Sequence, residues 1–225
     1  ASGKSGRWVS VDFSQEIEID FSDIRKTPLQ WPDYLLGVIS QFKAEGIHIP
    51  PFNAVIAADI PIGAGLSSSA ALEAVSAFAI NEWMGLGKSR KELALLCQRA
   101  ENQFIGLQCG IMDMFTSLLG KKDHAIRLDC RSLDYAYFPL ALKDYQIVLL
   151  NTGVSHSLAS SEYNLRRKQC ETGVEIISRV YPEVKSLRDI NMEMLLSCKN
   201  LMDPVIWKRC KFVVEENARV FLTCD

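Results

Sequence analysis

Apolar and polar residues alternate in two short segments near the beginning of the chain. WVSVDF (8–13) and IEIDF (17–21) show the alternation that is typical of half-buried strands. In residues 31–46 the apolar residues recur every three or four positions, which predicts an amphipathic helix that ends at Gly46. The expected buried face of this helix holds Tyr34, Leu35, Val38, Ile39 and Phe42.

Strand-like and helix-like patterns then follow one another in blocks. FNAVIAADI (52–60) predicts a strand that leads into a segment rich in glycine and serine. Helices are expected after it from about Ser68 to Trp83, from Ser89 to about Phe104, and from Ile111 to Gly120.

The second half of the chain begins with strands and continues with helices. HAIRLDC (124–130) and LDYAYFPL (133–140) are strand-like, and the apolar run in YQIVLLNTG (145–153) predicts a buried strand. From Ser160 onward the pattern is mostly helical, with a break at Tyr181–Pro182.

Because helices and strands come in blocks rather than in strict alternation, an α+β fold is favoured over a doubly wound parallel sheet. We expect two lobes, residues 1–142 and 143–225, with the boundary near Lys143. The final residues, ENARVFLTCD, still have a helical pattern and no capping glycine, so we expect the chain to be incomplete at its ends.

Composition and charge exclude several classes of protein. Hydrophobic residues make up 48% of the 225 residues and the formal net charge is −2, without the basic excess typical of nucleic-acid-binding proteins. No apolar run reaches the length of about 18 residues that a membrane span requires. The seven scattered cysteines contain no C-x-x-C pair, which indicates reduced thiols in a cytoplasmic protein and disfavours a zinc site. We expect a monomer without nucleic-acid or membrane partners.

The segment PIGAGLSSSAALE (61–73) carries the first candidate chemistry. Its glycines allow the backbone to approach a ligand, and the helix that follows presents unpaired N–H groups and a partial positive charge. Such a helix start binds anions, most often phosphate. The segment lacks the lysine of a Walker A motif, so a metal ion held by a serine and a carboxylate would have to balance the charge. A tight strand-to-helix turn with an ordinary serine cap is the alternative.

Two carboxylates could complete such a site. Glu101 falls on or beside the apolar stripe of its helix, so it is either a metal ligand or an edge residue that reaches solvent. Asp113 is the only charge in CGIMDMFTSLLG and lies in the first turn of the predicted helix. The helix dipole favours its ionised form, which a general base requires. A simple helix cap is the other interpretation of Asp113.

Taken in this order, these stretches resemble the galactokinases of the GHMP small-molecule kinase family. PIGAGLSSSA resembles the family's P-x-G-x-G-L-S-S-S-A signature, and CGIMDMF resembles the galactokinase stretch C-G-I-M-D-Q-F. Similar stretches are WPDYLLGV, LDCRSL and HSLASSEYNLRRKQCE, so the resemblance extends from about Trp31 to Arg219. It implies a two-lobed fold with a mixed sheet and helices in the first lobe and an α+β second lobe.

The resemblance also implies ATP-dependent phosphorylation of the C1 hydroxyl of galactose. Asp113 would take the proton from this hydroxyl, Gly110 and Tyr163 would contact the sugar, and Ser69 with Glu101 would hold Mg²⁺. The residues implied in nucleotide binding are Trp31 and Tyr34, near the adenine, and Gly63, Ala64, Gly65, Leu66, Ser67, Ser68 and Ser69, around the phosphates. From the pattern alone, Trp31 and Tyr34 are core residues of a helix.

The family's N-terminal G-R-V-N-L-I-G-E-H-x-D-Y stretch and its C-terminal G-G-G-x-G-G motif do not occur in this sequence. The first of these supplies sugar contacts, so three alternatives stay open. They are a related kinase acting on N-acetylgalactosamine or arabinose, a non-catalytic galactose sensor, and an inactive fragment. The intact Ser69–Ala70 pair favours an enzyme over the sensor, because sensors of this type are damaged at that pair.

Overall fold

The computed structural model describes residues 3–143, 145–150 and 159–224. The chain forms two compact units, Ala1–Ser155 and His156–Asp225, and each unit is described by itself. The lobe boundary expected near Lys143 stays a prediction.

A small mixed sheet begins the first unit. Its central strand, β1 (Ser5–Ser10), pairs antiparallel with β2 (Gln15–Asp20) and parallel with β3 (Ala54–Ile56). The ring of Trp8 on β1 is completely buried and stacks on Phe52 with a centroid distance of 5.6 Å. The two predicted N-terminal strands are therefore present, whereas the strand predicted over 52–60 is limited to three residues.

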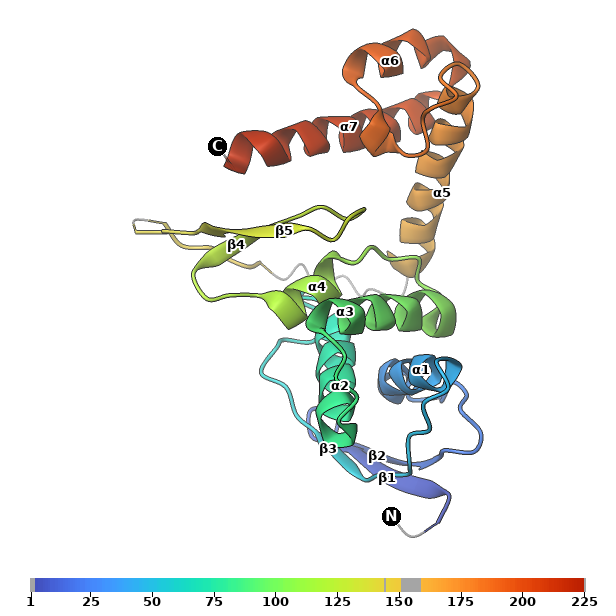
Figure 1. Ribbon diagram of the computed structural model, residues 1–225, viewed down its shortest axis with the longest axis vertical. Coiled ribbons are helices and arrows are strands. Elements are labelled where there is room, and N and C mark those ends of the chain that lie inside the picture. The colour runs from blue at the N-terminus through green and yellow to red at the C-terminus, as the bar shows by residue number, and fades with distance from the viewer. Residues whose placement is uncertain (1–2, 144, 151–158, 225) are drawn as a thin grey trace. The chain divides into compact units, whose positions relative to one another are not determined.

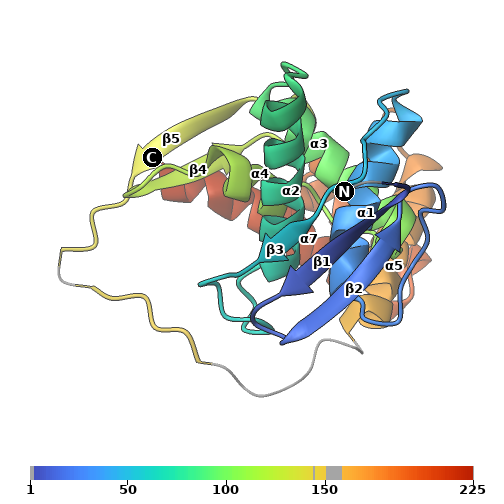
Figure 2. The ribbon, with the colours of Figure 1, turned by 90° about the horizontal axis from the view of Figure 1, so that it is seen from below.

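Helices pack over this sheet in the first unit, in the places that the periodicity predicts. They are α1 (Trp31–Ala44), α2 (Ser68–Met84), α3 (Arg90–Arg99), η1 (Ala100–Ile105) and α4 (Met112–Leu119). In Figures 1 and 2, α1 and α2 lie next to the sheet, while α3 and α4 contact α2 farther from it. Helix α2 thus connects the sheet with the elements that carry both candidate carboxylates.

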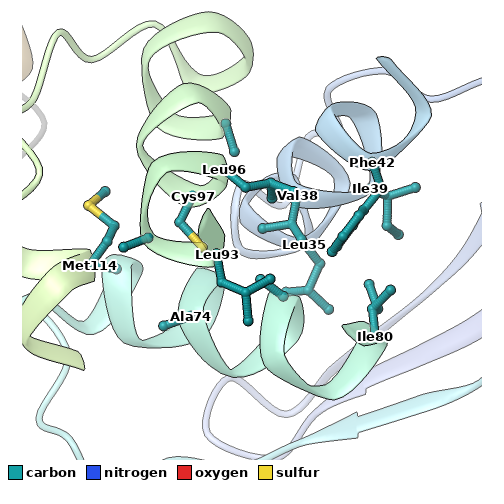
Figure 3. Packing of buried hydrophobic residues seen from close by; sticks show 14 of the residues in the cluster. Leu35, Val38, Ile39, Phe42, Ala74, Ile80, Leu93, Leu96, Cys97 and Met114 are labelled. Carbon is teal, nitrogen blue, oxygen red and sulfur yellow. The ribbon is translucent and has the colours of Figure 1, made fainter. Parts of the chain in front are cut away.

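The core of the first unit lies where α1, α2 and α3 meet. Figure 3 shows the apolar face of α1, with Leu35 and Val38 directed toward α2 and toward Leu93 and Leu96 of α3. Small residues on the facing side of α2, such as Ala74, let the three helices approach closely. This packing confirms a helix over residues 31–44. The helix is buried on most of its surface, including Leu36, Gly37 and Gln41, rather than on the single apolar face that the periodicity predicted.

A two-stranded hairpin completes the first unit. Strand β4 (His124–Leu128) pairs antiparallel with β5 (Tyr135–Pro139), as predicted. Tyr135 meets the ring of Phe115 edge-on at a centroid distance of 5.3 Å, which ties the hairpin to α4.

The prediction of a buried strand over 145–153 is wrong for residues 145–150. These residues form no strand and are exposed, with Leu150 at 85% of its full accessibility. Residues 151–153 lie outside the described part of the chain. An apolar run indicates a tendency to be buried, but a strand also needs a neighbour for its backbone hydrogen bonds. Within the described residues, no strand pairs with 145–150.

Within residues 159–224, all the regular elements of the second unit are helices, joined by short turns. Its elements are α5 (Ala159–Ser178), η3 (Leu187–Asp189), α6 (Met192–Ser197), η4 (Lys199–Leu201) and α7 (Pro204–Cys224). The predicted break at Tyr181–Pro182 falls between α5 and η3. A Cβ on Gly173 of α5 would lie only 2.2 Å from Cys210 Sγ of α7, so this close helix contact requires glycine. Among the described residues, no helix is long and apolar enough to cross a membrane.

Candidate active site

The glycine- and serine-rich segment forms an exposed turn between β3 and α2. Gly63 and Gly65 have φ angles of +73° and +75°, and a Cβ on either would meet nothing within 4 Å. These glycines are therefore required by the backbone conformation rather than by close packing. Gly63, Gly65 and Leu66 are exposed, so a ligand can approach the turn from solvent.

The first turn of α2 has room for an anion because no side chain caps it within the described residues. Ser67 occupies the N-cap position in a left-handed conformation, with φ at +55°, and its hydroxyl makes no capping hydrogen bond. Its carbonyl instead accepts from Ala71 N at 3.0 Å, which closes the first helical turn. The alternative of an ordinary serine cap therefore does not describe this helix, whose first N–H groups face outward from an open turn.

Glu101 is buried, at 5% of full accessibility, and lies where the helix changes its hydrogen-bond pattern. Helix α3 passes into the single π-helical turn η1, and Gly106 N donates to Glu101 O across five residues at 2.9 Å. A π turn inserts an extra residue into the helical cycle and often occurs at functional sites. The prediction of one helix as far as about Phe104 missed this turn, since amino-acid periodicity does not mark it. Glu101 is consequently not the solvent-reaching edge residue of the simpler interpretation.

The Glu101 carboxylate connects three segments of the first unit. Cys109 Sγ donates to Glu101 Oε2 at 3.1 Å. Burial raises the pKa of Glu101, and the negative charge of Asp113 raises it further, whereas the bond from Cys109 and the nearby hydroxyl of Ser69 lower it. Ser69 and Glu101 thus lie together, and Asp113 is close enough to influence the charge of Glu101.

Asp113 lies in the first turn of α4 and is half-buried. Ile111, not Asp113, occupies the N-cap position, so the helix-cap interpretation of Asp113 does not hold. The neighbouring Met114 and Phe115 are buried in the core and anchor the helix. The carboxylate is therefore held on a rigid element with one side open to solvent.

A third carboxyl group was not singled out in the sequence. Glu73 follows Ser69 by one helical turn on α2 and is fully buried, and neither of its carboxyl oxygens has a hydrogen-bond partner in the described structure. Burial raises the pKa of Glu73 to about 10, with a smaller contribution from Glu101. Its position in the PIGAGLSSSAALE segment, among the small residues of α2, was the signal that could have identified it.

The two aromatic residues implied in adenine binding both lie on α1. Trp31 is buried, at 5% of full accessibility, and its indole Nε1 has no hydrogen-bond partner in the described structure. Burial raises the pKa of Tyr34, and the negative charges of Glu101 and Glu73 raise it further, which places its hydroxyl on the side of α1 that faces these acids. Both residues belong to packed parts of the first unit, and their contact with a nucleotide stays a prediction.

The residues implied in sugar binding are in different units. Gly110 is exposed in the short segment before α4, and a Cβ there would meet nothing within 4 Å. Tyr163 lies on α5 in the second unit and is 45% exposed. Their roles stay predictions.

Comparison with known families supports the grouping of these residues. Residues 33–121, which contain the loop, Glu101 and Asp113, match the family described as "GHMP kinases N terminal domain". Over these residues the chain is similar to the GHMP kinases. The turn rich in glycine and serine, the π turn and the start of α4 all lie within the matched residues.

Curated GHMP kinases of high similarity are named galactokinases. The Thermosipho africanus (strain TCF52B) protein is 44% identical over 206 residues, which cover 92% of this chain and 56% of that protein. The Thermotoga neapolitana protein is 42% identical over 216 residues, which cover 96% of this chain and 59% of that protein. The chain thus spans less than two thirds of the length of these relatives.

Solved GHMP kinase structures share the fold. The Lactococcus lactis galactokinase, crystallised in complex with galactose, superposes with a TM-score of 0.91 at 31% identity, covering 99% of this chain and 58% of that one. The Methanococcus jannaschii mevalonate kinase has a TM-score of 0.54 at 16% identity, which shows the fold alone. The predicted α+β GHMP kinase fold is therefore confirmed.

The oxygen ligands at this GHMP kinase site fit a magnesium ion. Mg²⁺ prefers one or two carboxylate or hydroxyl oxygens and completes its shell with water and substrate phosphates. Ser69 and Glu101 offer such a pair at the start of α2. Within the described residues, no group of three or more His, Cys, Asp or Glu side chains could hold a metal ion by itself.

Proposed function

We propose that this chain carries the nucleotide-binding loop and catalytic base of an enzyme that transfers the γ-phosphate of ATP to the C1 hydroxyl of galactose. The observation that carries the proposal is the uncapped start of α2, where Ser69 lies near the buried carboxyl of Glu101 and Asp113 is close by. Phosphoryl transfer depends on positioning and charge neutralisation, and these residues provide both.

The phosphates of ATP bind to the turn formed by residues 63–69. The positive φ angles of Gly63 and Gly65 turn the backbone so that a ligand can approach it without meeting side chains. The open first turn of α2 contributes unpaired N–H groups and the positive end of the helix dipole. No lysine is present in this segment, so the backbone supplies most of the protein's contribution to phosphate binding.

Ser69 and Glu101 hold the magnesium ion that accompanies ATP. When bound, this ion neutralises charge on the phosphate oxygens. Glu101 is suited to the task because it is buried near Ser69. A buried carboxylate binds a cation more strongly than an exposed one, since less water screens the charges.

Asp113 accepts the proton of the attacking sugar hydroxyl. It projects from the first turn of α4, where the helix dipole stabilises the carboxylate anion. Galactose is the favoured acceptor because the similar curated proteins are named galactokinases and the similar Lactococcus lactis structure contains galactose. The product of the reaction is galactose 1-phosphate, and ADP leaves.

The test measures ADP release by the chain with galactose, N-acetylgalactosamine, arabinose or no sugar. We expect galactose-dependent turnover that falls by more than about a hundredfold in Asp113→Asn, which keeps the shape of the side chain but cannot accept the proton. Asp134→Asn is the matched control, because Asp134 is an exposed carboxylate in the same unit. Unchanged turnover in Asp113→Asn would overturn the assignment of the base.

Nucleotide binding is measured separately from turnover. We expect MgATP to raise the melting temperature of the chain, because a ligand that binds only the folded state stabilises it. Turnover with N-acetylgalactosamine or arabinose but not galactose would assign a related sugar kinase. Binding of MgATP without turnover on any sugar would restrict the proposal to the nucleotide-binding function.

A further inference from the structure

Cys109 contacts the proposed metal ligand directly but has no place in the mechanism above. Its Sγ lies 3.1 Å from Glu101 Oε2 and 3.5 Å from Asn102 Oδ1. A thiol carries a single proton, and the shorter contact assigns that proton to Glu101. A carboxylate that accepts a hydrogen bond is favoured in its ionised form, which is the form that binds a cation.

The backbone around Cys109 is fixed by several bonds to the preceding helix. Gln98 Nε2 of α3 donates to Cys109 O at 3.3 Å, and Cys109 N donates to Leu107 O at 2.8 Å. At the other end of this short segment, Leu107 N donates to Glu101 O at 3.2 Å, and Gln108 Nε2 donates to Asn102 O at 3.2 Å. The thiol therefore has a defined direction relative to the Glu101 carboxylate.

The thiol of Cys109 also remains a donor under ordinary conditions. Cys109 is only partly accessible, and its thiol proton is engaged in the hydrogen bond to Glu101 Oε2. Since the thiolate is the reactive form of cysteine, this environment disfavours alkylation and oxidation. Cys109 is thus suited to holding a carboxylate and poorly suited to nucleophilic or redox chemistry.

We propose that Cys109 is a positioning residue that orients the Glu101 carboxylate for the magnesium ion of MgATP. The proposal rests on the proposed function, in which Glu101 and Ser69 hold that ion. The thiol hydrogen bond occupies Oε2 of Glu101 and fixes the rotation of the carboxylate about its terminal bond. Without it, a buried carboxylate would lose both a donor and its defined orientation.

The experiment compares the affinity for ATP with and without Mg²⁺ by titration calorimetry on the whole chain. The dissociation constant for ATP without Mg²⁺, divided by that with Mg²⁺, measures how much the metal adds to ATP affinity. Effects that a substitution has under both conditions cancel in this ratio. We expect Cys109→Ala to reduce this ratio by about tenfold or more, the size of effect that loss of one charge-assisted hydrogen bond produces. Cys109→Ser keeps a donor at the same position, and we expect it to retain the ratio within about twofold.

Cys198→Ala is the matched control, because it removes a fully buried thiol from the second unit. We expect it to lower stability without changing the ratio. If Cys109→Ala weakens ATP binding equally with and without Mg²⁺, or if Cys109→Ser behaves like Cys109→Ala, the positioning role is wrong. If the unmodified chain shows no gain in ATP affinity with Mg²⁺, the proposed function fails first, and the role of Cys109 fails with it.

Discussion

The buried carboxyl of Glu73 makes the stability of the first unit dependent on pH. In the folded state its pKa is raised to about 10, whereas the ordinary value is 4.5. Between these two values, the unfolded chain has released a proton that the folded chain still holds. Because the unfolded state binds fewer protons, the free energy of unfolding falls as pH rises.

The size of this effect follows from proton linkage. Each pH unit inside the window from about 4.5 to about 10 lowers the free energy of unfolding by about 1.4 kcal/mol. Glu73→Gln removes the ionisable group and keeps nearly the same shape. From pH 5.5 to 7.5, the variant should therefore gain about 2.7 kcal/mol relative to the unmodified chain. Only below about pH 4.5, where both states hold the proton, should the two be similar in stability, since an amide and a neutral acid both leave buried polar atoms unpartnered.

Urea unfolding at pH 5.5, 6.5 and 7.5 measures the difference. Tryptophan fluorescence is the probe, and Trp207→Phe is introduced into both proteins so that the remaining tryptophans, at 8, 31 and 83, report only on the first unit. Glu82→Gln, an exposed carboxyl on the same helix, controls for the loss of a charge. If the free energies of unfolding of Glu73→Gln and of the unmodified chain differ by the same amount at all three pH values, Glu73 is ionised in the folded protein and the reasoning is refuted.

Two further predictions concern the ends of α2 and α3. Ser69→Ala should weaken ATP binding in the presence of Mg²⁺ by about tenfold, because it removes one proposed ligand oxygen beside Glu101, and calorimetry should show little change without Mg²⁺. Equal weakening in both conditions would indicate a general distortion of the loop. Ser89→Ala should lower the free energy of unfolding by about 1 kcal/mol, because Ser89 and Glu92 form a reciprocal capping box at the start of α3. A urea midpoint shift no larger than that of the exposed Ser117→Ala would contradict this.

Local sequence patterns predict the elements of the first unit well. The helices over 31–44 and 68–84 and the hairpin over 124–139 occur where periodicity and turn residues place them. The loop before α2 is equally clear, since only glycine readily adopts the positive φ angles at positions 63 and 65. These features depend on interactions between residues that are near each other in sequence.

The site is less predictable because its geometry depends on contacts between distant segments. The sequence suggests Glu101 and Asp113 as carboxylates of interest. It leaves open that Glu101 is an edge residue that reaches solvent and that Asp113 is a simple helix cap. The π turn at Ala100–Ile105 buries Glu101, and the segment that follows brings Cys109 Sγ to its carboxylate. Neither feature has a periodic signature, since both result from how α3, η1 and α4 meet.

The sequence by itself determined the family, the order of helices and strands, and the residues of the loop. Only the tertiary structure decided that Glu73 is buried without a partner and that residues 145–150 are exposed despite their apolar character. The physical reason is the same in both cases. A residue's polarity states its preference for water or for the core, but packing against the rest of the chain decides which environment it obtains and which partners it finds.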